Sequence, residues 1–577
     1  MDPIAPDRDH LRDRLPRLRP VRWLHPAQLV LIGIQVAQAR MFGAFGARRE
    51  NEAAQPAEIY DLSSPERDVW IDYTADVGDG FDSTYAVARS LAVDAVPGGD
   101  TTGHGELLVL GGDETYPVAS EDNYRARTMS VYRAALPERG DSSPALLAIP
   151  GNHDWYDGLT AFLRVFCQGW LADVPTPTQG AGAARMVDPR TRTSTFVGGW
   201  RTVQSRSYFA ARLPHGWWLW GTDIQFDTYI DAPQLAYFIE AATHLGPDDN
   251  VILCTAKPNW VGAGDPETIE RFIARTLGDR ADAVRLVCSG DRHHYSHYTP
   301  TDDSGPAALV TCGGGGAYLS PTHDLPDETT FGRWPDREAG YRRTRTFPDQ
   351  DESRRLARQF WRLPWRNPAL GALLGPVYAV LMWLLAATQP GAAALERLLD
   401  YSLADTRLAP ASLPALIGCI LVLAATLGLA RPSSGARTLA GLLHGAAHLG
   451  VLLGVTYAVG TSPRPGNAFA ASVLISLIVS IVGGIVGAYV LATYFFCCQA
   501  VARMHGNELF VGLRVEDYKS YLRLHVSAEG VRVYAVGLRS VPHRWKPSDR
   551  GPLLTPADGS SPELIEEPFT IPPRRDR

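Results

Sequence analysis

Short apolar runs alternate with segments of helical periodicity between about residues 65 and 337. The apolar runs cover residues 69–73, 107–110, 145–149, 217–220, 251–254, 284–288 and 307–311. Runs of this length, separated by helical patterns, are typical of the strands of a layered α/β domain. The pattern therefore predicts an α/β domain over residues 65–340.

Four much longer apolar stretches follow this domain. They cover residues 369–388, 412–430, 439–459 and 469–497, and none of them contains Lys, Arg, Asp or Glu. Each is close to or above the roughly 20 residues needed to cross the hydrocarbon core of a bilayer. We therefore expect four transmembrane helices within residues 369–498.

The segment before the α/β domain, residues 1–64, is first basic and then apolar. Its arginines are Arg8, Arg12, Arg14, Arg17, Arg19 and Arg22. Three glutamines and Arg40 interrupt the apolar residues 24–45, so we expect a helix that lies on the membrane surface or on the α/β domain. No apolar run closely follows Met1, which argues against a cleaved secretory signal.

Polar sequence returns after the fourth apolar stretch. Residues 521–526 and 531–537 alternate around a Ser-Ala-Glu-Gly turn, which predicts a hairpin in a small β-rich domain over residues 499–545. Prolines, glycines and charges dominate residues 546–577, so we expect this tail to be loosely ordered.

Charges beside the apolar stretches predict the orientation in a membrane. Residues 341–368 form a linker with eight arginines and three acidic residues, whereas residues 389–411 contain two arginines and three acidic residues. By the positive-inside rule the α/β domain is cytoplasmic. With four spans the C-terminal domain lies on the same side, in a multi-pass protein of the cell membrane.

Length, charge and cysteine content narrow the class of protein further. A chain of 577 residues exceeds what one hydrophobic core usually holds, which agrees with several domains. The 55 basic and 62 acidic side chains give a net charge of −7, so bulk charge indicates no nucleic-acid partner. The seven cysteines have no Cys-x-x-Cys spacing, which favours a reducing compartment. None of these features indicates an oligomeric state.

Side chains able to bind metals follow four of the apolar runs. They are Asp76, Asp113, Tyr116, Asn152, His153, Asp154, Asp291 and His293. Ligands bind at the carboxyl ends of the strands in open α/β sheets, so we expect these side chains to lie together. Carboxylate, amide and imidazole groups suit Mn, Fe, Zn or Mg, and one shared carboxylate can hold two such ions.

The order of these groups resembles a known family. The chain carries, in sequence, Asp76-x-Gly78, Gly112-Asp113-x-x-Tyr116, Gly151-Asn152-His153-Asp154 and Gly290-x-x-His293. In this order they resemble the calcineurin-like metallophosphoesterases, with the purple acid phosphatase pattern the most similar, in a membrane-anchored bacterial type. The resemblance implies a four-layer αββα sandwich that binds one or two divalent or trivalent metal ions.

The same resemblance implies a role for each residue. Asp76 and His293 would hold the first metal, with Tyr116 as a further ligand. Asp113 would bridge the two metals, and Asn152 would bind the second. In the catalytic pair, His153 would face the substrate and protonate the leaving oxygen or stabilise the phosphoryl group, while Asp154 would orient the imidazole.

The chain departs from the family pattern at the second metal. Lys257 stands where the pattern has a histidine ligand, and Asp291 stands where the later motif has another histidine. A charged ammonium cannot ligate a metal. The second metal would therefore keep Asp113, Asn152 and at most Asp291, while Lys257 would supply positive charge and contact the substrate phosphate.

Three features have structural interpretations beside the functional ones. Each aspartate taken singly is typical of turns and helix caps. The glycine run at residues 313–316 would either cradle a phosphate through backbone amides or form a tight turn near the site. His444 and His448, one helical turn apart among glycines, would bind a cation or haem, carry protons, or hydrogen-bond at a helix contact; we favour the last.

These observations predict a membrane-anchored, metal-dependent phosphoesterase. A metal-activated hydroxide would attack a phosphoester or phosphoanhydride of a small molecule, a lipid or a phosphoprotein. The alternative is a catalytically weak pseudo-phosphatase that binds a phosphate ligand and signals through its membrane helices.

Overall fold

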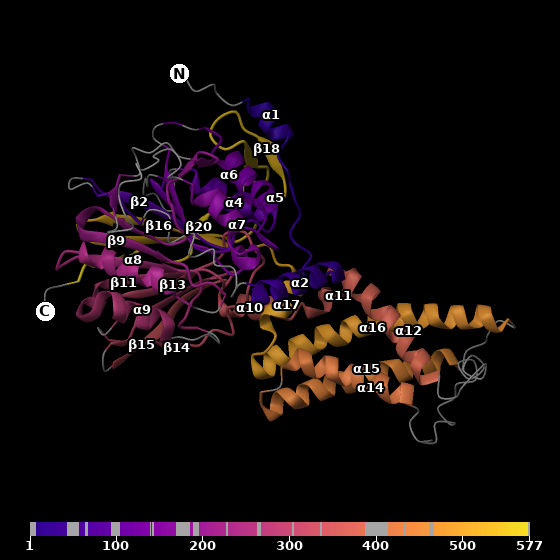
Figure 1. The fold of residues 1–577 in the computed structure, drawn as a ribbon. Helices are drawn as coiled ribbons and strands as arrows, with labels where there is room; N and C mark the ends of the chain where they lie inside the picture. Colours follow the sequence, from indigo (N-terminus) through magenta and orange to yellow (C-terminus); the bar gives the residue numbers. More distant parts are fainter. Residues whose placement is uncertain are drawn as a thin grey trace. The chain divides into compact units, whose positions relative to one another are not determined.

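In the computed structural model the chain divides into two units (Figure 1). The first unit consists of Met1–Val21, Ile32–Ser353 and Val515–Arg577, and the second of Arg22–Leu31 and Arg354–Arg514. The structure describes residues 7–42, 57–63, 67–93, 104–138, 140, 143–168, 185–188, 195–226, 229–261, 267–302, 305–334, 337–386, 413–431, 433–460 and 467–574.

Two large sheets form the first unit. One has the order β14 (Glu328–Trp334), β15 (Arg337–Phe347), β12 (Tyr295–Pro300), β13 (Ala308–Cys312), β11 (Val284–Ser289), β10 (Asn250–Thr255), β9 (Trp217–Thr222), β8 (Phe209–Arg212), β1 (Glu58–Asp61) and β5 (Arg185–Val187). The other has the order β20 (Glu563–Leu564), β17 (Gly530–Leu538), β16 (Lys519–Ser527), β2 (Val69–Thr74), β3 (Leu107–Leu110), β4 (Ala145–Ala148), β7 (Trp200–Thr202) and β6 (Thr195–Val197), with β21 (Phe569–Ile571) paired to β17. All seven predicted apolar runs are strands within these sheets.

The sheets pack against each other because their strands are apolar on both faces. Val109 of β3 joins the core between the sheets, which also contains Ile252 of β10, whereas its neighbour Leu108 joins a second core. The second core lies between the nine-stranded sheet and α4 (Phe81–Leu91), α6 (Ser130–Ala135) and α7 (Thr160–Phe166). Helices α8 (Ala232–Thr243) and α9 (Glu267–Leu277) pack on the ten-stranded sheet (Figure 1). The first unit is thus an α/β sandwich, as predicted.

The C-terminal hairpin belongs to this sandwich and is not a separate domain. Strand β16 pairs antiparallel with β2, from Leu522 opposite Tyr73 to Val526 opposite Val69. Alternate residues of β16 enter the two cores, so the hairpin buries both of its faces. The prediction of an independent domain over residues 499–545 is therefore wrong. Strand β16 covers the edge that β2 would otherwise expose.

Two further predicted boundaries also change. Residues 546–574 are ordered: β18 (Trp545–Pro547) pairs with β19 (Leu554–Pro556), while β20 and β21 pair with β17. The linker predicted from residue 341 begins later, because β15 continues to Phe347 and α10 (Gln350–Ala357) follows.

The N-terminal arm contains α1 (Arg8–Asp13) and ends against the sandwich, where the Val21 amide donates to Asp79 Oδ1 at 2.7 Å. Helix α2 (Pro26–Phe42) occupies the predicted interfacial segment.

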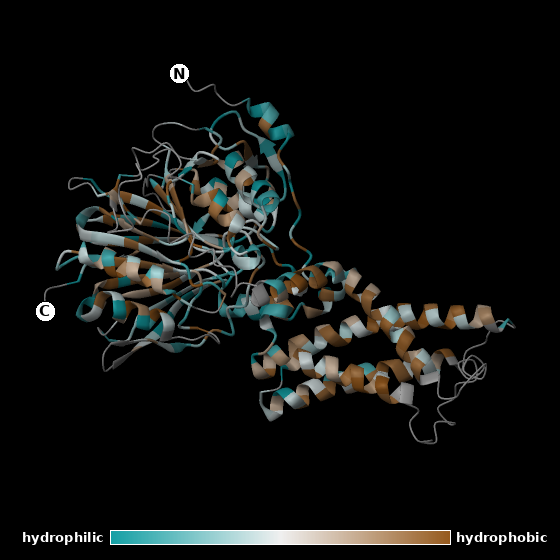
Figure 2. Cartoon of the chain, viewed as in Figure 1, coloured by the Kyte–Doolittle hydropathy of each residue, from teal (hydrophilic) through white to brown (hydrophobic). Residues whose placement is uncertain are grey.

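The second unit contains the four predicted apolar segments, and all four are helical. They are α12 (Pro368–Ala386), α14 (Leu413–Ala430), α15 (Gly435–Gly460) and α16 (Ala468–Ala502), and Figure 2 shows their mostly apolar composition. Shorter elements flank them, namely η6 (Phe360–Arg362) and α11 (Leu363–Arg366) before and α17 (Gly506–Leu513) after. Within the described residues, α15 and α16 are long and apolar enough to cross a membrane. A third span results if Phe360–Arg366 and Pro368–Leu384, bent by 83°, count as one.

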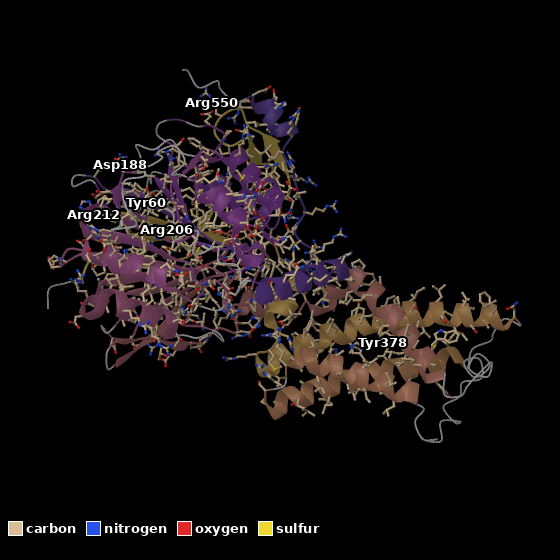
Figure 3. All side chains as sticks on the ribbon, viewed as in Figure 1. Tyr60, Asp188, Arg206, Arg212, Tyr378 and Arg550 are labelled. Carbon is tan, nitrogen blue, oxygen red and sulfur yellow. The ribbon has the colours of Figure 1, made fainter. Side chains whose placement is uncertain are left out.

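His444 and His448 of α15 contact each other inside the second unit. His448 Nε2 lies 3.0 Å from His444 Nε2, and His448 Nδ1 lies 2.7 Å from the hydroxyl of Tyr378, which Figure 3 places on α12. A Cβ on Gly445 would lie 2.8 Å from side-chain atoms of α14, so these helices approach closely. This arrangement supports the interpretation of a hydrogen-bonded pair at a helix contact.

Candidate active site

Three aspartates that follow strands share an unusual backbone conformation. Asp76 after β2, Asp113 after β3 and Asp291 after β11 have φ of 60°, 55° and 64°. Positive φ is disfavoured for residues with a Cβ and is tolerated mainly where the surroundings impose it, often at functional sites. Backbone hydrogen bonds join two of these turns, since Asp76 N donates to Gly112 O and Val77 N donates to Asp113 O.

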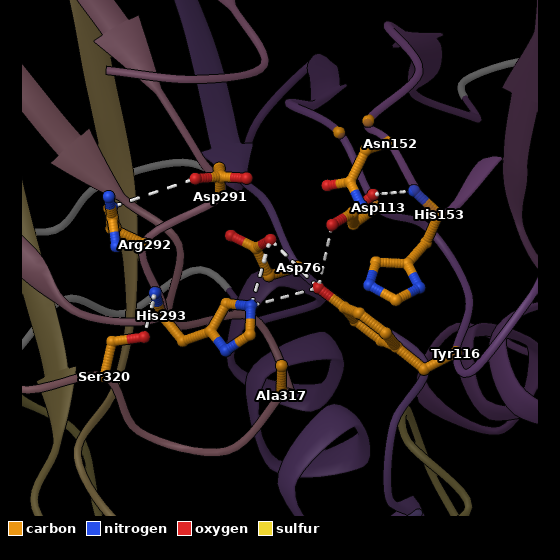
Figure 4. Close-up of polar contacts among 12 residues, drawn as sticks. Asp76, Asp113, Tyr116, Asn152, His153, Asp291, Arg292, His293, Ala317 and Ser320 are labelled. Atoms are coloured by element: carbon orange, nitrogen blue, oxygen red, sulfur yellow. Dashed lines mark hydrogen bonds and ion pairs between the residues drawn. The ribbon is translucent and has the colours of Figure 1, made fainter. Parts of the chain in front are cut away.

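The predicted ligands of the first metal converge on one hydroxyl (Figure 4). Tyr116 Oη lies 3.0 Å from Asp76 Oδ1, 3.1 Å from Asp113 Oδ2 and 3.2 Å from His293 Nε2. His293 Nε2 is also 3.5 Å from Asp76 Oδ1. The four side chains are buried and come from three separate strand ends. The structure thus brings together all four residues that the sequence assigned to the first metal.

The charge of this cluster favours a bound cation. Burial raises the pKa of Asp76 well above its usual range, and the nearby Asp113 and Asp291 carboxylates raise it further. Burial also raises the pKa of Asp113, and the nearby Asp154 and Asp291 carboxylates raise it further. Asp76 Oδ2 is buried without a hydrogen-bond partner in the described structure. A cation would compensate this buried negative charge, and the donor set suits Mn, Fe, Zn or Mg.

The cluster requires glycine beside Asp76 and does not have the final geometry of a metal centre. A Cβ on Gly313 would lie 2.2 Å from Asp76 Oδ2, so only glycine leaves room next to this oxygen. Across the described part of the chain, no group of three or more His, Cys, Asp or Glu side chains is already arranged around a metal position. The Tyr116 hydroxyl lies between the donors, so a cation would have to displace it or bind beside it.

Asn152 and His153 connect the Gly-Asn-His-Asp segment to Asp113. The His153 backbone N–H donates to Asp113 Oδ1 at 2.8 Å. Asn152 Nδ2 donates to Tyr156 Oη at 3.2 Å, an orientation that leaves the amide oxygen available to a cation. Both predicted residues therefore lie next to the carboxylate proposed as the bridge.

The His153 imidazole is positioned by a different group from the one predicted. Its Nδ1 lies 2.7 Å from the Pro117 carbonyl oxygen, so Nδ1 carries the hydrogen. Burial lowers the pKa of His153 to about 4, which keeps the ring neutral at pH 7. A neutral ring with its hydrogen on Nδ1 can accept a hydrogen bond or a proton at Nε2, whereas the predicted acid role requires the protonated ring.

Asp154 braces the backbone instead of orienting the imidazole. Its carboxylate accepts hydrogen bonds from the Gly151 amide at 2.8 Å, from the Glu114 amide at 3.3 Å and from the Tyr124 hydroxyl. These contacts tie the Gly-Asn-His-Asp turn to the loop after β3. The predicted orienting contact with His153 is therefore replaced by a structural one.

A small cavity lies beside Asp113, where the second metal was expected. Its volume is about 20 Å³, and it is lined by Asp113, Gly151, Asn152, Ile224, Gln225, Phe226, Ala256, Lys257 and Asp291. That volume holds roughly one water-sized atom. Lys257 thus shares the cavity with all three remaining donors of the second position, and Asp291 also lies 3.8 Å from Arg292 Nε.

The glycine run supports the interpretation of a tight turn near the site. The amides of Gly313, Gly315 and Ala317 donate to the carbonyls of His294, Ala75 and Asp76. Because the Gly313 and Gly315 amides donate to protein carbonyls, these two amides are not available to an anion. The run instead packs the turn that carries Asp76.

Two residues near the site lie outside the sequence motifs and were not predicted as site residues. Lys519 of β16 is fully buried, and its ammonium donates to the Ala317 carbonyl, next to Asp76. Burial lowers the pKa of Lys519 to about 8. Gln225 lines the cavity with a φ of 52°. Only its place just after β9, at the ligand-binding edge of the sheet, would have suggested Gln225.

Comparisons with known proteins give limited similarity. No protein-family model matches this chain, and no curated protein matches it. Among solved structures, purple acid phosphatase PPD1 from yellow lupin (Lupinus luteus) seeds is similar over 49% of this chain, with 11% sequence identity and a TM-score of 0.27. The match spans about half of the phosphatase chain, 48%.

Proposed function

We propose that the chain is a metal-dependent phosphoesterase of the calcineurin-like type. The convergence of Asp76, Asp113, Tyr116 and His293 on one point carries this proposal. Asp76, Asp113 and His293 would hold one cation there, with Tyr116 as a further donor. Such a cation would supply a Lewis acid for phosphoryl oxygens and a source of nucleophilic water at neutral pH.

At the cavity beside Asp113, side chains of the protein would bind the phosphate and accept a hydrogen bond or a proton. Lys257 would bind a phosphoryl oxygen through its ammonium and offset the charge of the phosphate. His153 would accept a hydrogen bond or a proton at Nε2, because its Nδ1 hydrogen is directed to Pro117. The substrate would be a phosphate ester or anhydride carried by a small molecule, a lipid or a protein.

A pseudo-phosphatase is the second candidate function. Lys257 at the second metal position favours it, because an ammonium there opposes binding of a second cation. In that case the site would bind a phosphate group without hydrolysing it.

Two measurements on the purified full-length protein separate the candidates. The first is hydrolysis of p-nitrophenyl phosphate and bis(p-nitrophenyl) phosphate with added Mn, and the second is calorimetric binding of inorganic phosphate. Metal-dependent turnover supports the enzyme. Phosphate binding with no turnover under any metal supports the pseudo-phosphatase, and neither binding nor turnover refutes both.

A further inference from the structure

The short helical segment that precedes α12 exposes two tryptophans. This segment consists of η6 and α11, covers Phe360–Arg366 and belongs to the second unit. Trp361 is 50% exposed and Trp365 is 75% exposed. Among the tryptophans whose side chains the structure describes, only these two are exposed, whereas the others are buried or half-buried. Two neighbouring exposed indoles mark a surface that contacts a partner or a membrane.

Other side chains of the same segment fix it within the second unit. The Phe360 ring stacks on Phe496 of α16, with centroids 4.5 Å apart and planes at 12°. Leu363 is fully buried. At the junction with α12, Asn367 Nδ2 donates to the Leu363 carbonyl at 2.9 Å and to the Gly512 carbonyl at 2.7 Å. The segment is therefore held in place while its tryptophans stay exposed.

The bend after this segment sets its direction relative to a bilayer. Phe360–Arg366 and Pro368–Leu384 are bent by 83° from each other. The apolar helix α12 exposes Leu373, Val377 and Val380, a stripe at helical spacing that suits contact with acyl chains. If α12 crosses a bilayer, the segment before it runs almost parallel to the bilayer surface. Tryptophan is enriched at this level, where one side of the ring is apolar and the other is wet.

Exposed arginines lie on and beside the same segment. Residues 353–366 contain five arginines and no acidic residue. Arg355, Arg358 and Arg362 are exposed, and in the described part of the chain no ion pair joins them to a carboxylate. The Arg362 guanidinium lies over the Trp361 ring, with Cζ 5.1 Å from the centroid. The exposed apolar surface is therefore bordered by positive charge.

We propose that residues 355–366 bind the surface of a bilayer that contains anionic phospholipids. Trp361 and Trp365 insert between the headgroups, while Arg355, Arg358 and Arg362 contact the lipid phosphates. Cations beside an apolar surface match a partner that is anionic outside and apolar beneath, whereas a free phosphate ion would not cover the indoles. None of these residues belongs to the candidate active site, so binding can be measured without hydrolysis.

The test uses the full-length protein in micelles of an uncharged detergent. The protein is titrated with phosphatidylglycerol or phosphatidylcholine, each brominated near the headgroup, because bromine quenches the fluorescence of adjacent tryptophans. We expect the anionic lipid to reach half-maximal quenching at a lower fraction than phosphatidylcholine, by about tenfold. Trp361→Phe with Trp365→Phe should remove the quenching that is specific to phosphatidylglycerol.

Variants of the arginines test the contribution of charge. Arg358→Gln with Arg362→Gln should raise the half-maximal fraction of phosphatidylglycerol by about tenfold and leave that of phosphatidylcholine unchanged. Arg358→Lys with Arg362→Lys retains both charges and should retain the preference. As a matched control, Arg212→Gln removes an exposed arginine of β8 in the first unit and should change neither value. Circular dichroism verifies that each variant is folded.

Four results would overturn this proposal. Three are equal quenching by the two lipids, an unchanged preference in Arg358→Gln with Arg362→Gln, and unchanged quenching in the double tryptophan variant. The fourth is displacement of phosphatidylglycerol by inorganic phosphate beyond that by chloride at equal ionic strength, which would indicate a site for a phosphate ion. Because no arm of the test uses hydrolysis, this proposal and the proposed function can fail separately.

Discussion

At the residue scale, Lys257 makes the two halves of the candidate site chemically different, because it lines only the second half. The first half has two carboxylates and an imidazole around the Tyr116 hydroxyl. The second has Asp113, Asn152 and Asp291 around a cavity that Lys257 also lines. A unit positive charge near a divalent cation raises the energy of binding it. One metal should therefore bind more tightly than the other.

Replacing both departures from the family pattern should create a second tight metal site. The double variant Lys257→His with Asp291→His exchanges an ammonium and a carboxylate for two imidazoles, which are good ligands for Mn, Fe or Zn. We expect the second Mn equivalent to bind at least about tenfold more tightly by calorimetry and metal analysis. Hydrolysis would fall if Lys257 contacts the phosphate.

A lysine away from the cavity provides the control for this prediction. Lys546 of β18 is exposed, so Lys546→His should leave the metal content unchanged. Two equally tight metals in the unmodified protein, with no change in the double variant, would show that Lys257 does not affect the second position.

The site was predictable at the residue scale wherever a motif follows a strand. Asp76 and Asp113 meet because they follow the carboxyl ends of the neighbouring strands β2 and β3, which the apolar runs had located. His293 follows β11 of the other sheet and reaches them because the two sheets pack face to face. The partner of His153 was not predictable, because it is the carbonyl of Pro117, and any residue carries a carbonyl. Gln225 was not predicted, because its distinguishing feature is its backbone φ angle, which the sequence does not show.

At the element scale, β16 extends the sheet whose strands β2 and β3 precede Asp76 and Asp113. Its residue Arg523 is fully buried and makes a paired contact with Asp72 of β2, at 2.7 Å from Nε to Oδ1 and 3.0 Å from Nη2 to Oδ2. The guanidinium also donates to the carbonyls of Leu91 and Val93. The sequence of β16 shows that it is a strand, but alternation does not specify which edge it joins.

Breaking this buried pair should destabilise the first unit strongly. Arg523→Met leaves the Asp72 carboxylate buried without its partner, so we expect a loss of about 3–5 kcal/mol in the free energy of unfolding. Arg532 lies on the adjacent strand β17 but is exposed, so Arg532→Met should change stability by no more than about 0.5 kcal/mol. Chemical denaturation measures both. Equal effects would mean that β16 does not pair with β2 through Arg523.

At the scale of the whole molecule, the shared sheet limits the number of membrane crossings. The chain leaves the first unit at Ser353 and returns to it at Val515, where β16 soon pairs with β2. Both points must lie on the same side of any membrane that the intervening helices cross, so the number of crossings is even. If the helices cross a membrane, an odd number such as three is inconsistent with this sheet, whereas two crossings, by α15 and α16, or four are consistent with it.

We propose four spans, and the arginines before α12 orient them with the sandwich in the cytoplasm. Alkaline phosphatase inserted at residue 400, between the first two apolar helices, should therefore be active, because it would lie outside the cytoplasm. A fluorescent protein fused after Arg577 should fold and fluoresce in the cytoplasm. An inactive phosphatase at residue 400 with the same fluorescent C-terminus would instead indicate two spans.

In the proposed function, the cluster around Tyr116 binds a metal that the protein uses to hydrolyse phosphoesters. The most direct test of this function is titration of the metal-free full-length protein with Mn, Fe, Zn or Mg during hydrolysis of p-nitrophenyl phosphate, beside the Asp113→Asn variant. We expect saturable metal-dependent turnover that falls by about 100-fold or more in the variant, with an unchanged circular dichroism spectrum. Turnover that needs no metal, or that is equal in the two proteins, would contradict it.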